Sequence, residues 1–318
     1  MVFLIQKTLL YAVPLLIVAL AGVFAERSGI INIALDGIMI FGSFIGALTV
    51  YIIQSAGALD GHPQIIFFIA MAVSAAAGAL FSLLLSFSAV NLRADQTISG
   101  TALNMLAPAL SLFFIKVFFM QDKLDMPHDV GYVMLNDDMN AVGRAFFDKA
   151  YVSTYVSIAL FIVLSVLLYT TKFGLRLRAC GEHPQAADSV GINVYKMRYA
   201  GVLISGALGG LGGIIYVTCG VSEWKFEYGV AGFGFLALAV MIFGQWKPTR
   251  IALAGLLFGL FRALSNVYSG IDILAALNLP SAIYNMMPYI ISLLVLALTS
   301  KKSRAPKAEG IPYDKGSR

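Results

Sequence analysis

Residues 151–198 read YVSTYVSIALFIVLSVLLYTTKFGLRLRACGEHPQAADSVGINVYKMR, an apolar run followed by a polar island. The apolar part is long enough to cross a bilayer, and a second such run, Met197–Thr218, follows the island. Five Lys or Arg residues lie within Lys172–Arg198, and basic loops beside spans stay on the cytoplasmic face. Pro184 suits the start of a short helix and Gly191 suits its end. We expect this cytoplasmic helix to be offered to a soluble partner.

The composition is that of a polytopic membrane protein. Of 318 residues, 59% are hydrophobic and only 12% are charged, which leaves too few polar side chains to cover a soluble globule of this size. The net charge of +5 is mostly local, because Lys301–Arg318 holds six basic and two acidic residues. Anionic lipid beside a cytoplasmic tail explains this bias better than nucleic-acid binding does. Cys180 and Cys219 fall on opposite sides of one expected span, which argues against a disulfide between them.

Apolar runs along the chain predict an all-α, polytopic transmembrane bundle of about nine spans, within a range of eight to ten. The runs are Thr8–Ala25, Asn32–Ile53, Gln64–Phe87, Gly100–Phe119, Tyr151–Thr171, Met197–Thr218, Gly232–Phe243, Ile251–Tyr268 and Ile283–Thr299. The seventh run is unusually short. We expect one transmembrane domain over residues 1–300, and a disordered, basic cytoplasmic tail over residues 301–318.

Glycines recur four residues apart within several of these runs. The pairs are Gly42 and Gly46, Gly206 and Gly210, Gly209 and Gly213, and Gly255 and Gly259. Such spacing lets helix backbones approach closely in a membrane, so it predicts tight packing within the bundle. A dimerisation seam is the alternative.

Charge also sets the expected orientation. Basic residues place Lys172–Arg198, the Lys247–Arg250 turn and the tail from Lys301 inside, whereas the acidic segment Gln121–Ala150 lies outside. Counting backward puts the N-terminus outside. That count depends on whether Glu26–Asp36 turns at the membrane surface or breaks a helix within it.

The segment Glu26–Gly37 interrupts an otherwise continuous apolar stretch with charged and amide side chains. An ionisable group inside a membrane is costly, so Asn32 and Asp36 need a water-filled or protein-lined site. Four residues apart, they lie on one helical face, and the functional interpretation is a broken helix lining a solute path. The alternative is that Glu26 and Arg27 form a cytoplasmic turn, while Asn32 and Asp36 cap the next helix.

Single polar groups in other apolar runs are further candidates for the solute pathway. They are Asn104, Arg262 and Asn266. The alternatives are a helix-to-helix hydrogen bond for Asn104 and snorkelling of Arg262 to the outer surface. Phe233 and Phe235 lie in the short seventh run, which suits a half-helix at a midplane site.

Charged and aromatic residues alternate at Glu223, Trp224, Phe226 and Tyr228 on the expected outer face. Aromatic residues at this level form an interfacial belt. They could also stack on a planar solute or dock an extracellular partner, so we take these four as candidates for a binding-protein site or outer gate.

Motifs typical of enzymes do not occur in this sequence. His62, His128 and His183 are scattered, and the acidic residues near His128 read as solvated loop residues, so we expect no metal site. The sequence has no Gly-x-Ser-x-Gly elbow and no phosphate-binding Gly-x-x-x-x-Gly-Lys-Ser/Thr loop. We therefore expect no catalytic residues and no ATP hydrolysis by this chain.

Three segments together resemble the membrane permeases of ATP-binding-cassette (ABC) importers in the branched-chain amino acid and simple sugar superfamily. They are Glu26–Gly37, Gly181–Ile192 and Gly232–Pro248. The Glu-Arg-Ser-Gly opening and the Phe-Gly-x-Trp-x-Pro ending are most similar to the nucleoside-importing branch, in particular to the smaller of its two paired permeases. The resemblance runs from Tyr11 to about Thr299 and leaves the tail unmatched. Family members commonly have Gly and Glu where this chain has Ala34 and Asp36, which leaves the solute open.

The resemblance implies a type II ABC importer-like permease with a broken helix near the N-terminus. It also implies four partners: a second permease subunit, a cytoplasmic ATPase that binds ATP and Mg, an extracytoplasmic binding lipoprotein, and membrane lipid. Residues Glu182–Val190, here named the coupling segment, would dock into the ATPase, with Glu182 and Asp188 meeting basic groups there. The docking candidates are Gly181, Glu182, His183, Pro184, Ala186, Ala187, Asp188 and Gly191.

We therefore expect a multi-pass subunit of a bacterial inner or plasma membrane that imports a nucleoside, in particular a purine nucleoside, and binds no cofactor itself. One alternative is the same architecture with a simple sugar, a branched-chain amino acid or a flavin as cargo. The other is a channel or membrane enzyme that needs no ATPase.

Overall fold

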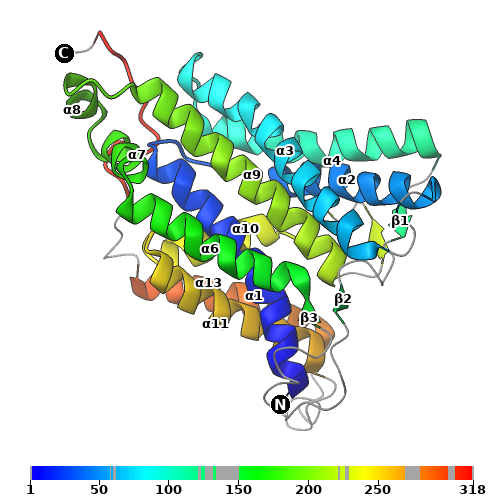
Figure 1. Cartoon of the computed structure of the whole chain (residues 1–318). Helices are drawn as coiled ribbons and strands as arrows, with labels where there is room; N and C mark the ends of the chain where they lie inside the picture. The colour runs from blue at the N-terminus through cyan, green and yellow to red at the C-terminus, as the bar shows by residue number, and fades with distance from the viewer. Residues whose placement is uncertain are drawn as a thin grey trace.

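A computed structural model describes residues 2–57, 59, 62–120, 123–125, 132–133, 150–220, 223–225, 229–268, 280–299 and 305–316. Figure 1 shows long helices packed side by side. The long helices are α1 (Val2–Arg27), α2 (Leu35–Ser55), α3 (Pro63–Val90), α4 (Gln96–Phe119), α6 (Val152–Thr170), α9 (Val194–Gly220), α11 (Pro248–Val267) and α13 (Ser281–Thr299). The shorter helices are α7 (Lys172–Glu182), α8 (Pro184–Ser189) and α10 (Phe233–Phe243).

The prediction of an all-α membrane protein is confirmed. Among the described residues, seven helices are long and apolar enough to cross a membrane, and α10, with 11 residues, is a shorter apolar helix. Each of the nine apolar runs overlaps one described helix, with α13 matching the last of them. Two antiparallel pairs of very short strands accompany the bundle: β1 (Lys123–Asp125) with β4 (Glu223–Lys225), and β2 (Tyr132–Val133) with β3 (Ala150–Tyr151). Strands of two or three residues carry no periodicity that a sequence could reveal.

Helix α1 lies at the centre of the bundle, where it packs against α6, α9, α10 and α11. Its residues 12–25 are almost all buried, although it is the first helix of the chain. A helix that is apolar on all sides is suited to such an interior position. The centre of the fold is therefore formed by the helix that leads directly into the Glu26–Gly37 segment.

Glycine contacts bring α2, α3 and α9 together, as the spacing predicted. A Cβ atom on Gly210 would lie 2.2 Å from the carbonyl oxygen of Ser74, and one on Gly78 would lie 2.3 Å from that of Gly206. A Cβ atom on Gly42 would lie 2.3 Å from Cα of Gly210. These glycines are used for close packing inside this chain.

The bundle has two distinct ends (Figure 1). One, here named the α8 end, contains α7, α8 and the last turn of α1, whose Arg27 contacts Glu182. The other, here named the strand end, contains the β-strands and the N-terminus. The two chain termini thus lie at opposite ends of the bundle (Figure 1).

The described part of the tail, Ala305–Gly316, packs against the α8 end, which differs from the expected disorder. Tyr313 is buried in a cluster with Cys180, Ala187 and Val194. Arg93 donates two hydrogen bonds to the Asp314 carboxylate, each 3.1 Å long. The expectation of disorder considered only the charges of the tail. Tyr313 and Ala308 bury apolar surface, and this burial favours the packed tail over a solvated one.

Candidate functional site

Helix α1 ends inside the protein, and the next helix does not begin until Leu35. The intervening residues, Ser28–Ala34, are here named the break. Gly29 adopts φ +95°, and the amides of Gly29 and Ile30 donate to the carbonyls of Glu26 and Ala25 at 2.9 and 3.2 Å. This pair of bonds is a glycine-terminated helix end, which a non-glycine residue would strain. Most of the break is buried, and it separates two helices that are each long enough to cross a membrane, so the chain is interrupted where the sequence predicted.

Polar side chains from α4 form hydrogen bonds with backbone groups of the break that have no helical partner. The amide of Ile31 donates to Oε1 of Gln96 at 2.7 Å. Asn104 donates from Nδ2 to the carbonyl of Ile33 at 2.9 Å and accepts from the amide of Gly37 at 2.7 Å. Buried backbone groups outside a helix need such partners, since an unpaired one is costly. Of the two interpretations of Asn104, the structure supports the helix-to-helix hydrogen bond.

Asp36 binds the N-terminus of the half-helix α10. Its Oδ1 accepts a hydrogen bond of 2.9 Å from the amide of Gly234. The first amides of a helix lack partners in their own helix and carry partial positive charge, so a carboxylate stabilises them. A Cβ atom on Gly234 would lie 2.4 Å from Cα of Asp36, so only glycine permits this approach.

Asn32 and Asp36 do not share a helical face, and neither caps α2 with its side chain. Asn32 precedes α2 and lies buried in the break, where its Nδ2 donates to Oγ of Ser205 on α9 at 2.8 Å. Its Oδ1 is buried without a hydrogen-bond partner. The predicted pair is therefore separated: Asn32 faces α9, whereas Asp36 faces α10.

Aromatic rings and one arginine gather at the start of α10. The ring of Phe233 lies 4.3 Å from that of Tyr216 on α9 and 6.4 Å from that of Tyr11 on α1. The Arg262 guanidinium lies 5.8 Å from the Phe233 ring centroid, within the range of a cation–π contact. Arg262 therefore contacts the protein interior and does not simply snorkel outward.

Phe235 and Asn266, like Asn32 and Asn104, lie outside this cluster, and two of its members were not predicted. Phe235 is 48% exposed, and exposed Asn266 donates from its amide to the carbonyl of Arg262 on its own helix. Tyr11 and Tyr216 were missed, although a tyrosine within an apolar run was a signal, since its hydroxyl needs a partner.

At the α8 end, the coupling segment forms the expected short helix. Pro184 occupies the first turn of α8, and Gly191, with φ +83°, follows its end. The amides of Gly191 and Ile192 donate to the carbonyls of Asp188 and Ala187 at 2.9 and 3.0 Å, which is the Schellman arrangement. The prediction of a Pro-started, Gly-ended helix is confirmed.

The two faces of the coupling segment differ in exposure. The buried residues are Gly181, Pro184 and Ala187, and the exposed ones are His183, Gln185, Ala186, Ser189, Val190 and Gly191. A Cβ atom on Gly181 would lie 2.4 Å from the carbonyl oxygen of Arg27, so α7 touches the end of α1 there. Val190, a hydrophobic residue, is 74% exposed. The outward face is therefore neutral and partly apolar.

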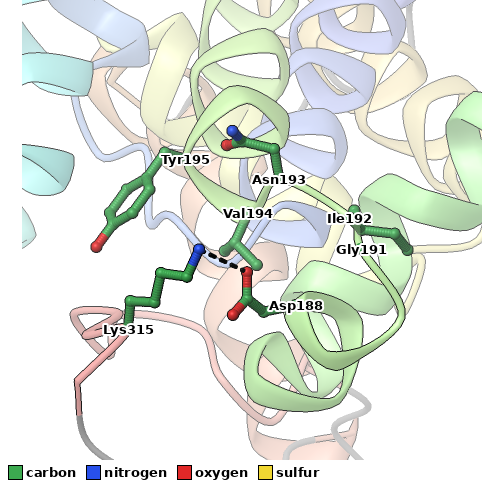
Figure 2. A pocket seen from close by; sticks show the side chains of 7 residues that line it. All are labelled: Asp188, Gly191, Ile192, Asn193, Val194, Tyr195 and Lys315. Carbon is green, nitrogen blue, oxygen red and sulfur yellow. Dashed lines mark ion pairs between the residues drawn. The ribbon is translucent and has the colours of Figure 1, made fainter.

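Both acidic residues of the coupling segment pair with cations of this same chain, while their expected contact with basic groups of the ATPase stays a prediction. Glu182 Oε1 lies 3.1 Å from Arg27 Nη1, and Asp188 Oδ1 lies 3.8 Å from Lys315 Nζ. Figure 2 shows Lys315 reaching from the tail toward Asp188. Both residues line a cavity of about 300 Å³. These cations lie far away in the sequence, so local charge could not reveal them.

Two further acidic residues, Glu26 at the end of α1 and Glu309 in the tail, lie close enough to repel each other where the tail meets α1. The indole of Trp246, just after α10, donates to the Glu26 carboxylate, which joins the ends of α1 and α10. Burial raises the pKa of nearby Glu309, on the tail, to about 7, although Arg27 opposes the shift. Burial likewise raises the pKa of Cys180 in α7 to about 11, which makes this thiol unreactive.

The remaining candidates lie at the strand end. Glu223 and Trp224 belong to β4, where Trp224 pairs in register with Leu124 of β1. Phe226 and Tyr228 lie outside the described residues. Within the described ranges, no group of three or more His, Cys, Asp and Glu residues could hold a metal ion.

In the part of the chain that the structure describes, seven helices of spanning length, among them the buried central helix α1, define a multi-pass membrane protein. A family model described as branched-chain amino acid transport system / permease component matches residues 4–297, and the chain belongs to this family.

Two relatives match along almost their whole length. The chain is 42% identical to the nucleoside ABC transporter permease protein NupC of Lactococcus lactis, over 98% of this chain and 96% of the relative. It is also 42% identical to the guanosine ABC transporter permease protein NupQ of Bacillus subtilis, over 99% and 97%. A further nucleoside permease of L. lactis, NupB, is 24% identical over 81% and 71%. No solved structure matches.

Proposed function

We propose that this chain is the membrane-spanning permease subunit of an ATP-driven importer of nucleosides, in particular purine nucleosides. The observation that carries the proposal is the 42% identity, over nearly the whole chain, to two permeases named for nucleoside and guanosine transport. In the assembled transporter, a partner ATPase binds ATP and Mg, and a binding lipoprotein delivers the nucleoside. A second permease completes the path, in keeping with the two nucleoside permeases NupB and NupC of one organism.

The α8 end faces the cytoplasm in this proposal, with the tail on the same side in a bacterial cell membrane. The basic residues of α7, among them Lys172 and Arg176, favour this orientation. Glu223, Trp224, Phe226 and Tyr228 then lie on the outer side, where they remain candidates for contact with the lipoprotein.

The exposed face of α8 is the docking site for the ATPase. ATP binding closes the ATPase dimer, and α8 passes that motion to the bundle. A continuous set of contacts is available: Glu182 pairs with Arg27, Arg27 leads into the break, and Asp36 holds α10 through Gly234. Access to the path then alternates at Asp36 and at the aromatic residues around Phe233.

Docking is tested by changing exposed residues of α8 in the complex with the ATPase. Ala186→Trp and Val190→Asp should remove the ATPase from purified permease, while Ala186→Ser and Val190→Ile should retain it. Ala187 is a poorer position for this test, because it is 3% exposed and packs beneath the helix. Normal ATPase capture and coupled uptake in Ala186→Trp and Val190→Asp chains would refute the docking site.

Cargo is tested by uptake of labelled guanosine and ribose in cells that express the whole transporter. Saturable, ATP-dependent guanosine uptake that ribose does not inhibit is the expected result. Uptake of ribose alone, of a branched-chain amino acid or of a flavin would assign the same architecture to another cargo. Transport by the purified chain without an ATPase would instead favour a passive channel.

A further inference from the structure

We propose that the tail segment Ala305–Gly316 is a strap that links the coupling segment mechanically to the break. The inference rests on the proposed function, because it concerns how motion of α8 reaches the helices. It starts from two backbone hydrogen bonds on tail residues that are two positions apart. The amide of Ala308 donates to the carbonyl of Gly181 at 2.9 Å, and the amide of Gly310 donates to that of Gly29 at 3.2 Å.

These two bonds join the parts of the chain that a coupling motion must connect. Gly181 lies in the last turn of α7, directly before the coupling segment, and Gly29 lies at the start of the break. Space around Gly29 is tight, since a Cβ atom there would lie 3.0 Å from Arg198 Nη2 and 3.4 Å from the Ala308 carbonyl oxygen. The strap, the break and α9 are therefore in close contact around Gly29.

Further along, the strap grips α8 itself. The Tyr313 side chain is buried among Cys180, Ala187 and Val194, and its ring lies 5.4 Å from that of Tyr195. Lys315 reaches the Asp188 carboxylate on α8, as Figure 2 shows. Ala187 is the residue whose carbonyl closes the end of α8, so the strap packs against the fixed side of that helix.

The strap is also anchored outside the coupling segment. Arg93, in the turn between α3 and α4, holds Asp314 with two hydrogen bonds of 3.1 Å. An exposed ion pair of this kind adds little stability, but its two parallel hydrogen bonds fix the orientation of Asp314 relative to Arg93. With anchors on α8, on the break and on the α3–α4 turn, displacement of α8 pulls on the break through a second route besides the Glu182–Arg27 contact.

Amide hydrogen exchange on the purified, full-length permease tests the strap without any ATPase. Ala308→Pro removes the N–H that binds Gly181, whereas Ala308→Ser keeps it. We expect Ala308→Pro to raise exchange about tenfold in both the coupling segment and the break, the scale of losing one backbone hydrogen bond. Ala308→Ser should match the wild type. Faster exchange confined to the tail, with α8 and the break still protected, would overturn the proposal.

The assembled transporter gives the functional readout. Ala308→Pro and Tyr313→Ala should retain the ATPase and its hydrolysis but lose most nucleoside uptake per ATP, while Ala308→Ser and Tyr313→Phe should stay close to the wild type. An unchanged ratio of uptake to hydrolysis would overturn the strap, as would loss of the ATPase from the Ala308→Pro complex. Failure of the wild-type chain to bind any ATPase would instead refute the proposed function, which separates the two outcomes.

Discussion

Replacing Gly234 by alanine should displace α10 from α2. The new Cβ atom would lie 2.4 Å from both Cα and N of Asp36, so backbone atoms, not a mobile side chain, must yield. Separating the helices breaks the 2.9 Å bond from the Gly234 amide to the Asp36 carboxylate. Loss of a charge-assisted bond costs about 1.5–3 kcal/mol, and overpacking costs about 1–3 kcal/mol more. We expect a total loss of stability on the order of 2.5–6 kcal/mol.

Thermal unfolding of the purified chain measures this loss, which should lower Tm by about 5 °C or more. Gly316→Ala is the matched control, because its Cβ atom would meet only Asp314 Oδ1, at an ordinary 3.7 Å. Asp36→Ala should not rescue Gly234→Ala, since the clashing Cα and N atoms remain. A Gly234→Ala chain that melts together with the wild type would refute this account of the α2–α10 contact.

Two further changes probe the break and the tail. Asn104→Leu removes both bonds that hold Ile33 and Gly37 and should lower stability by about 2–5 kcal/mol in the same melting assay, while exposed Asn266→Leu should change it by about 0.5 kcal/mol or less. Glu309 has a pKa of about 7 when the tail is docked against Glu26 and Arg27 and an ordinary value of 4.5 otherwise, so docking takes up a proton between these pH values. The contribution of Glu309 to the stability of the docked tail is therefore fully present below pH 4.5 and is lost as pH rises through 7. Amide protection of residues 305–316, corrected for intrinsic exchange, should fall over this range in the wild type but not in Glu309→Gln; equal pH dependence in both would contradict the assignment.

The length and apolarity of the runs were sufficient to predict the helices, because a membrane imposes both properties on each span. The glycine spacings likewise predicted close packing, and Gly78, whose contact with Gly206 completes the α3–α9 crossing, adds a glycine outside the predicted pairs. Local rules also gave the ends of α8, since Pro184 and Gly191 act on the backbone next to them. Span length and apolarity are set by the surrounding membrane, and the glycine spacings and helix ends are set by residues a few positions apart, so all of them can be predicted from the sequence.

The polar residues of the break show where such reasoning fails. Assigning Asn32 and Asp36 to one face assumed that α2 already includes Asn32, but α2 begins at Leu35. Asp36 then caps α10, a helix that begins almost two hundred residues later, through the Gly234 amide. No local pattern identifies that partner. The sequence shows that Asn32 and Asp36 are costly to place in a membrane. Only the fold shows which groups form the hydrogen bonds that offset this cost.

The internal pairing of Glu182 and Asp188 has a consequence for the ATPase interface. With these acids bound to Arg27 and Lys315, the outward face of α8 offers neutral groups such as Ala186 and the exposed Val190. Contacts of this kind are not screened by salt, whereas an exposed charge pair loses most of its attraction when the Debye length falls to about 3 Å at 1 M salt. Permease immobilised with its ATPase should therefore retain it from low salt to about 1 M salt. Release of the ATPase at high salt, from the wild type but not from Glu182→Gln, would return the acids to the interface and contradict the pairing inside this chain.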